Sequence, residues 1–184
     1  MKNIIIILIF ISLHSCGIDD KNLEKGSKSI EKESKIEKIE EIKVIKEYWE
    51  YSESEDKMSG EIKKFAVNTS TNKLNFEFPY DGGSTATITL RKNGKSIDAI
   101  LRISKGQFNI SYNGGSIRIK FDKNKPETYK YLTTSDGSQD VIFIEPTKKF
   151  IKQIEKSNNL IIETEFFNEG IRQLEFTVSN LKWE

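Results

Sequence analysis

Apolar and polar residues alternate along most of the chain from about residue 48 onward. Ala86, Ile88 and Leu90, for example, are separated by threonines in residues 85–91. Successive side chains of a strand point to opposite faces, so a period of two predicts strands with one buried face. The pattern predicts strands at residues 49–51, 62–68, 74–78, 85–91, 96–104, 107–112, 116–122, 129–134, 141–144, 160–167 and 171–179.

Turn residues separate these strands. Asn93-Gly94 is the strongest short hairpin signal in the chain, and Asn113-Gly114-Gly115 and Asp136-Gly137 are of the same kind. Residues 141–144 form an uninterrupted apolar run, which is typical of a strand buried on both faces. Connections of this length between short strands favour antiparallel neighbours.

One helix is expected near the end of the chain. Pro146 suits a first helical turn, and Phe150, Ile151 and Ile154 form an apolar stripe. The sequence therefore predicts a mainly β fold, an antiparallel sandwich or barrel of about 10–11 strands with one late α-helix.

The first residues have the pattern of an export signal. Lys2 precedes the apolar run 4–13, which is too short to span a bilayer because a spanning helix needs about 20 residues. Leu13, Ser15 and Cys16 then resemble the lipobox of bacterial lipoproteins. This resemblance implies cleavage before Cys16 and lipidation of its thiol, and hence a protein that is lipid-anchored in the cell envelope.

The alternative is an ordinary signal peptide cut near Ser15, which would leave an incidental cysteine. His14 departs from the small or apolar residue common at its position in the lipobox. Gly17 lacks the acidic side chain that, by the family rule in some bacteria, retains lipoproteins at an inner membrane, so an outer membrane is compatible.

The chain divides into three parts by composition. Residues 1–15 are the expected signal peptide, 16–45 the lipidated cysteine with a charged tether, and 46–184 a β-rich globular domain. Residues 17–45 contain seven lysines and eight acidic residues, which is typical of a solvated arm. Isoleucines from Ile36 onward leave a short helix open as an alternative.

Composition excludes several kinds of chemistry. The single histidine and the single cysteine are His14 and Cys16, so the expected mature domain has no imidazole and no free thiol. Ser-His-Asp and Cys-His catalysis, disulfides and His/Cys metal sites are thereby excluded, and we expect no cofactor and no metal. The formal net charge of +1 gives no sign of a strongly basic surface, so we expect no nucleic-acid partner.

Four residues are candidates for contact with a ligand or partner: Trp49, Tyr51, Arg118 and Trp183. Trp49 and Trp183 lie near the two ends of the domain and could flank a ligand groove. The favoured alternative is that they close the core where the first and last strands meet. Arg118, with Lys120, could bind an anionic group, whereas the default is a solvated face paired with carboxylates.

Two charged clusters are weaker candidates. Glu163, Glu165 and Glu175 could serve hydrolysis or calcium binding, since carboxylate pairs remain available to an enzyme without histidine. The lysines of the predicted helix could contact anionic lipid headgroups, and ordinary solvation is the favoured alternative. These lysines are Lys148, Lys149, Lys152 and Lys156.

The β-rich part resembles a widespread group of small, exported and largely uncharacterised bacterial proteins, and is distantly similar to envelope accessory proteins associated with type VI secretion. Turn and aromatic motifs carry the resemblance: Trp49-x-Tyr51, Asp56-x-Met58-Ser59-Gly60, Pro79-Tyr80-x-Gly82-Gly83-Ser84, Gly106-Gln107-Phe108, Phe121-Asp122 and Phe176-x-Val178-x-x-Leu181-x-Trp183. It implies a fold and no catalytic residue. The cysteine pair of many members is absent here.

The expected function is therefore a membrane-anchored lipoprotein whose β-domain binds or scaffolds a cell-envelope component, such as an envelope protein. A glycan- or lipid-binding module is the second hypothesis, and a carboxylate-dependent hydrolase is the third. Catalysis is not expected.

Overall fold

The computed structural model describes residues 47–111 and 113–183. The expected signal peptide, Cys16 and the tether lie outside the described residues. The division of the chain at residues 15 and 45 therefore stays a prediction.

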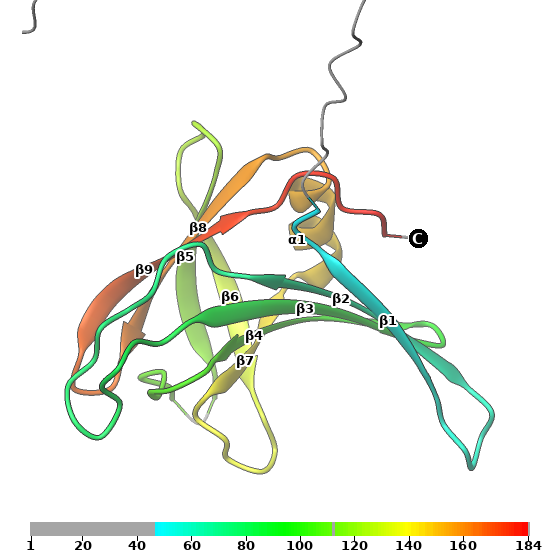
Figure 1. Cartoon of the computed structure of the whole chain (residues 1–184), viewed down its shortest axis with the longest axis horizontal. Coiled ribbons are helices and arrows are strands. Elements are labelled where there is room, and N and C mark those ends of the chain that lie inside the picture. The colour runs from blue at the N-terminus through cyan, green and yellow to red at the C-terminus, as the bar shows by residue number, and fades with distance from the viewer. Residues whose placement is uncertain (1–46, 112, 184) are drawn as a thin grey trace, which may run out of the picture. The chain divides into compact units, whose positions relative to one another are not determined.

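The described residues form one antiparallel sheet of nine strands and one short helix (Figure 1). The spatial order of the strands is β1-β2-β3-β4-β7-β6-β5-β8-β9. In chain order the elements are β1 (Glu50–Glu55), β2 (Ile62–Thr69), β3 (Ala86–Asn93), β4 (Ser96–Ile103), β5 (Gly115–Phe121), β6 (Glu127–Thr133), β7 (Val141–Glu145), α1 (Thr147–Ile154), β8 (Asn159–Phe166) and β9 (Gly170–Thr177).

Hairpin turns join most sequence neighbours, as the turn residues predict. In the β3–β4 hairpin, Asn93 pairs with Ser96 across a turn in which Gly94 has a φ of +56°. Such a positive φ strains residues with a Cβ, which explains the glycine. The order changes at β7, which pairs with both β4 and β6, and at β5, which pairs with β6 and β8.

The sheet is not closed, because β1 and β9 do not pair with each other. The segment after β2 instead meets the free edge of β9. Thr71 N donates to Glu175 O at 2.7 Å, and Glu175 N donates to Asn72 Oδ1 at 2.9 Å. Asn68 Nδ2 also donates to Thr177 O at 2.9 Å. A short loop contact thus replaces a ladder at this seam, and β1 stays at the outer edge.

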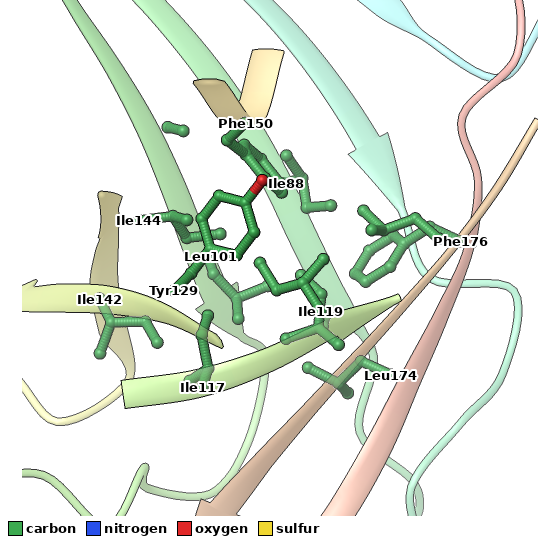
Figure 2. Packing of buried hydrophobic residues seen from close by; sticks show 14 of the residues in the cluster. Ile88, Leu101, Ile117, Ile119, Tyr129, Ile142, Ile144, Phe150, Leu174 and Phe176 are labelled. Atoms are coloured by element: carbon green, nitrogen blue, oxygen red, sulfur yellow. The ribbon is translucent and has the colours of Figure 1, made fainter. Parts of the chain in front are cut away.

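The core lies on the inner face of this curved sheet (Figure 2). Ile88 and Leu101 from β3 and β4 lie close to Ile119 from β5 and to Leu174 and Phe176 from β9. All five side chains are at most 2% exposed. The alternation in the sequence therefore does correspond to a buried face, and burial of these apolar surfaces is the main force that holds the fold.

Helix α1 packs against β4 and β7. Its buried residues are Thr147, Phe150, Ile151 and Ile154, which include the predicted apolar stripe. Pro146 occupies the N-cap position with extended backbone dihedrals. Tyr129 and Phe150 meet edge to face at 6.0 Å between ring centroids, which joins the helix to the core.

The expected fold class, mainly β with one late helix, is confirmed, with nine strands described in place of 10–11. Residues 74–78 and 107–112 contribute isolated bridges, Leu74 to Ser84 and Phe108 to Phe166. Their alternation reflects aromatic packing, since Phe76 and Phe108 each lie with ring centroids 5.0 Å from that of Phe166. Val141, Ile142 and Ile144 are buried, as expected for β7.

Candidate functional site

A surface groove of about 700 Å³ lies at the open edge of the sheet, between the β1–β2 hairpin and the C-terminal segment. We call it the edge groove. Its lining residues come from both ends of the domain: Tyr51, Ser52, Glu53, Lys64, Phe65, Leu181, Lys182 and Trp183.

Strand β1 forms one wall of the edge groove. It pairs with β2 alone, and all six of its residues are exposed. Tyr51 pairs with Ala66 and Glu53 with Lys64, so these side chains continue the inner face beyond the fully buried Ala66. One side of the groove therefore extends the inner face past the point where the core ends, whereas Ser52 and Phe65, which pair with each other, lie on the opposite face of the hairpin.

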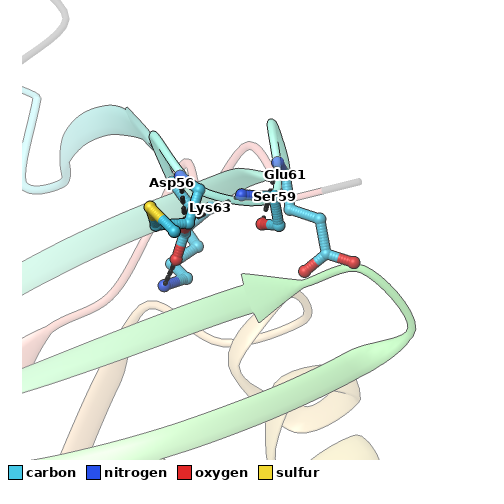
Figure 3. A network of polar contacts seen from close by, with 5 residues as sticks. Asp56, Ser59, Glu61 and Lys63 are labelled. Carbon is cyan, nitrogen blue, oxygen red and sulfur yellow. Dashed lines mark hydrogen bonds and ion pairs between the residues drawn. The ribbon is translucent and has the colours of Figure 1, made fainter.

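The turn at the tip of this hairpin is closed by Asp56 (Figure 3). Asp56 Oδ1 accepts hydrogen bonds from the backbone N–H groups of Met58 at 2.9 Å and Ser59 at 3.2 Å. Lys63 Nζ lies 3.3 Å from Asp56 Oδ2. These contacts, the Met58 bond foremost, lower the pKa of Asp56, so its carboxylate stays charged and keeps the turn in place.

The C-terminal segment forms the other wall. After β9 the chain turns at Asn180, which has a φ of +63°, and runs toward β1 (Figure 1). Lys182 N donates to Tyr51 Oη at 2.8 Å, and Lys182 Nζ lies 3.3 Å from Glu47 Oε1. Trp183 is half-buried against the core cluster. The Tyr51 hydroxyl thus fixes the last residues of the domain beside β1.

The edge groove combines aromatic surface with polar groups. Tyr51 is 43% exposed, and Phe65 and Trp183 are half-buried. The Trp183 Nε1 is buried and has no hydrogen-bond acceptor among the described residues. Glu53 and Lys64 form an ion pair of 3.3 Å in which both side chains are more than half exposed, so the pair can separate at little cost. An extended peptide or a sugar ring could therefore contact aromatic side chains here and also form hydrogen bonds.

Two of the four predicted contact residues, Tyr51 and Trp183, therefore lie together in one groove. Trp49 has a different position. It is 3% exposed, and its Nε1 donates to Val178 O at 3.1 Å. It also borders a smaller hollow of about 200 Å³ that shares Tyr51 and Lys182 with the edge groove. Trp49 thus closes the core where the first and last segments meet, as the favoured alternative expected.

Arg118 lies away from the edge groove, in a hollow of about 250 Å³ whose lining residues also include Lys120 and Glu163. Arg118 Nη1 lies 2.6 Å from Glu163 Oε1, and Gln173 Nε2 donates to Glu163 Oε2 at 2.8 Å. The Gln173 bond and then Arg118 lower the pKa of Glu163. The default expectation of a paired charge describes Arg118. Anion binding there would compete with Glu163.

The described residues offer no group of three or more acidic, His or Cys side chains that could hold a metal ion. Glu163, Glu165 and Glu175 therefore do not form such a group. Among the same residues, no helix is long and apolar enough to cross a membrane. The predicted lipidation site, Cys16, lies outside the described part of the chain.

The sequence pattern points to only two of the eight residues that line the edge groove, and the six others include the apolar Phe65 and Leu181. Phe65 is apolar at a position out of phase with the buried Ala66, and such an isolated apolar side chain on a strand is common. Leu181 appeared only as part of a terminal motif. A local signal for the groove was absent, since it forms between segments about 130 residues apart in the chain.

The chain matches no protein-family model, no curated protein and no solved structure. The resemblance of the sequence to exported bacterial proteins therefore stays a prediction.

Proposed function

We propose that this chain is a membrane-anchored lipoprotein whose β-domain binds another component of the cell envelope, with the edge groove as the contact. The sequence supports the anchor through the apolar run and the lipobox-like residues that end at Cys16. The observation that carries the binding role is the edge groove, which places Tyr51 and Trp183 together at an open sheet edge.

The first candidate for the bound component is an extended segment of an envelope protein. The backbone of β1 pairs on one side with β2, and no other described strand pairs with it. An exposed edge strand can accept a further strand, with its alternate side chains entering neighbouring pockets. Glu50, Glu53 and Glu55 make β1 acidic, so a segment with basic residues would be complementary.

A glycan is the second candidate, because exposed aromatic rings bind sugar rings through their apolar faces. Tyr51 and Trp183 supply such rings in the same groove. The inner face of the sheet, by contrast, is filled by isoleucine, leucine and phenylalanine side chains (Figure 2). A sugar would therefore have to bind at the edge groove and not within the sheet.

Site-specific photocrosslinking in cells that make the lipidated chain tests the binding role. A photoreactive amino acid at Ser52, on the groove wall, should give a discrete protein adduct. The same amino acid at Thr128, an exposed position on β6, is the matched control. The Tyr51→Ala/Trp183→Ala double variant should lose the Ser52 adduct.

The outcomes separate the candidates. Identical adducts from Ser52 and Thr128 would contradict the proposal of a specific groove. Absence of a protein adduct, together with retention on isolated envelope glycan that needs Trp183, would favour the glycan. The anchor is tested separately, because Cys16→Ser should stop fatty-acid labelling, and undiminished labelling would contradict it.

A further inference from the structure

The exposed side of α1 carries a row of lysines, which we call the basic face: Lys148, Lys152 and Lys156. Residues four apart on a helix are neighbours on one side, and Lys156 lies in the turn that extends α1. The opposite side of the helix is buried against β4 and β7. Packing of α1 therefore forces these three ammonium groups outward together.

Positive charge is concentrated at this helix. Residues 147–156 contain four lysines and one glutamate, a net charge of +3, whereas the whole chain has a formal net charge of +1. The fourth lysine, Lys149, is occupied, since its Nζ lies 2.6 Å from Glu127 Oε2 and 5.0 Å from the Tyr129 ring centroid.

The three lysines of the basic face differ from Lys149. Within residues 47–111 and 113–183, no carboxylate lies at ion-pairing distance from any of them. The loop after β5 contacts the segment just beyond the helix, where Asp122 Oδ1 accepts a hydrogen bond from Asn158 N at 3.0 Å. Two exposed lysines, Lys123 and Lys125, lie in that loop.

The basic face is better suited to contact with an array of anionic groups than to the binding of a single anion. The basic face borders a hollow of about 360 Å³ lined by Gln153 and by lysines that are all exposed. Lysine is a flexible point charge and lacks the fixed two-pronged geometry with which arginine grips a single phosphate. A row of separate, solvated ammonium groups is complementary to a surface that presents an array of negative charges.

The position of α1 in the domain adds a second argument. Trp49 Nε1 donates to Val178 O, and Val178 N donates to Asn158 O at 2.8 Å. The start of the described chain is therefore bonded, through Val178, to the segment that follows α1. Trp49, and with it the start of the described residues, therefore lies at the C-terminal end of the helix that carries the basic face.

We propose that the basic face of α1 binds anionic lipid headgroups and so sets the orientation of the domain on its membrane. The proposal rests on the proposed anchor for its setting, but not on the edge groove. Each lysine near an anionic surface contributes modestly, so the three together correspond to roughly 100-fold in apparent affinity. A lipid anchor would raise the local concentration of headgroups, so this modest affinity suffices to orient the domain.

Vesicle co-sedimentation tests the proposal without the anchor. The protein is the chain of residues 17–184, which omits the apolar run and keeps the whole buried core from Trp49 to Val178. Binding to vesicles of phosphatidylcholine with about 30% phosphatidylglycerol is expected at low salt, with none to phosphatidylcholine alone. It should fall steeply as salt is raised, because the Debye length shortens.

Two triple variants make the test specific. Lys148→Gln/Lys152→Gln/Lys156→Gln is expected to lose roughly 100-fold in affinity for the anionic vesicles. The control, Lys57→Gln/Lys73→Gln/Lys95→Gln, removes the same charge from three exposed loop positions and should stay within about threefold of the parent. Circular dichroism of both variants checks that each is folded.

Three results would overturn the proposal. They are absence of binding to the anionic vesicles at low salt, an equal loss in both triple variants, and displacement from the vesicles by millimolar inorganic phosphate at constant ionic strength. The last would mean a site for a single anion. None of these results depends on lipidation of Cys16 or on the groove adducts, so failure here is distinguishable from failure of the proposed function.

Discussion

The indole Nε1 of Trp49 donates a 3.1 Å hydrogen bond to the carbonyl oxygen of Val178, 129 residues further along the chain. Both residues are buried, at 3% and 0% exposed. This bond joins the segment before β1 to the segment after β9. It secures the seam at which the sheet is not closed, and it holds in place the walls of the edge groove.

Removing this bond should destabilise the domain more than removing the other indole. Trp49→Phe leaves the buried Val178 oxygen without its donor, which costs about 1–3 kcal/mol in the free energy of unfolding. Trp183→Phe should change it by less than about 1 kcal/mol, because that Nε1 has no acceptor among the described residues. Urea denaturation of both variants measures the difference. Equal effects would contradict a stabilising role for the Trp49–Val178 hydrogen bond.

Removal of the Tyr129 hydroxyl, in contrast to removal of the Trp49 indole, should not lower the free energy of unfolding. Tyr129 is 1% exposed, its oxygen is buried without a hydrogen-bond partner, and burial raises its pKa. Tyr129→Phe should therefore leave the free energy of unfolding unchanged or raise it by up to about 1 kcal/mol. Tyr129→Leu, which removes the ring contacts with Phe121 and Phe150, should lower it. A loss above about 1 kcal/mol in the Phe variant would reveal an acceptor for this hydroxyl.

Two glycines of positive φ should respond differently to alanine. A Cβ on Gly106, which has a φ of +103°, would lie 2.6 Å from a carbon of the Phe76 ring, whereas a Cβ on Gly94 meets nothing within 4 Å. Gly94→Ala should cost about 1 kcal/mol through backbone strain alone. Gly106→Ala should cost about 1–3 kcal/mol more, since a buried ring must move. Thermal unfolding of the pair measures this, and equal costs would mean that Phe76 shifts freely.

The ion pair of Arg118 and Glu163 should contribute little to stability. The Arg118 side chain is 60% exposed, so solvent screens the charge attraction despite a separation of 2.6 Å. A double-mutant cycle with Arg118→Gln and Glu163→Gln should give a coupling energy of at most about 1 kcal/mol that shrinks at high salt. A larger coupling, insensitive to salt, would mean that this face is covered by something in solution.

Acid should weaken the domain partly through Asp136. A hydrogen bond from the Thr134 side chain, followed by one from the Ser138 backbone N–H, lowers the pKa of Asp136 to about 2 from 3.8. The charged form is therefore favoured by folding. Its contribution is complete above about pH 4 and is lost as the pH falls toward about 2. Asp136→Asn should flatten the pH dependence of unfolding in that window, and an unchanged slope would contradict it.

Much of the fold follows from local pattern. The inward face of β3, with Ala86, Ile88 and Leu90, is readable because a strand repeats every two residues whatever it pairs with. Asn93-Gly94 similarly indicates its hairpin because the required φ is a property of the turn itself. The apolar stripe of α1 and Pro146 before it are equally local signals.

Pairing and position depend on distant parts of the chain. The segments around Phe76 and Phe108 alternate as strands do, yet these two rings pack on Phe166 and their segments do not extend a ladder. Local alternation alone cannot distinguish such a packed segment from a strand. Local sequence pattern is sufficient to predict a mainly β domain with one late helix and to make Tyr51 and Trp183 candidates for ligand contact. That these two share a groove while Trp49 is buried is visible only in the folded domain, because contacts between residues over a hundred positions apart depend on how the whole sheet curves.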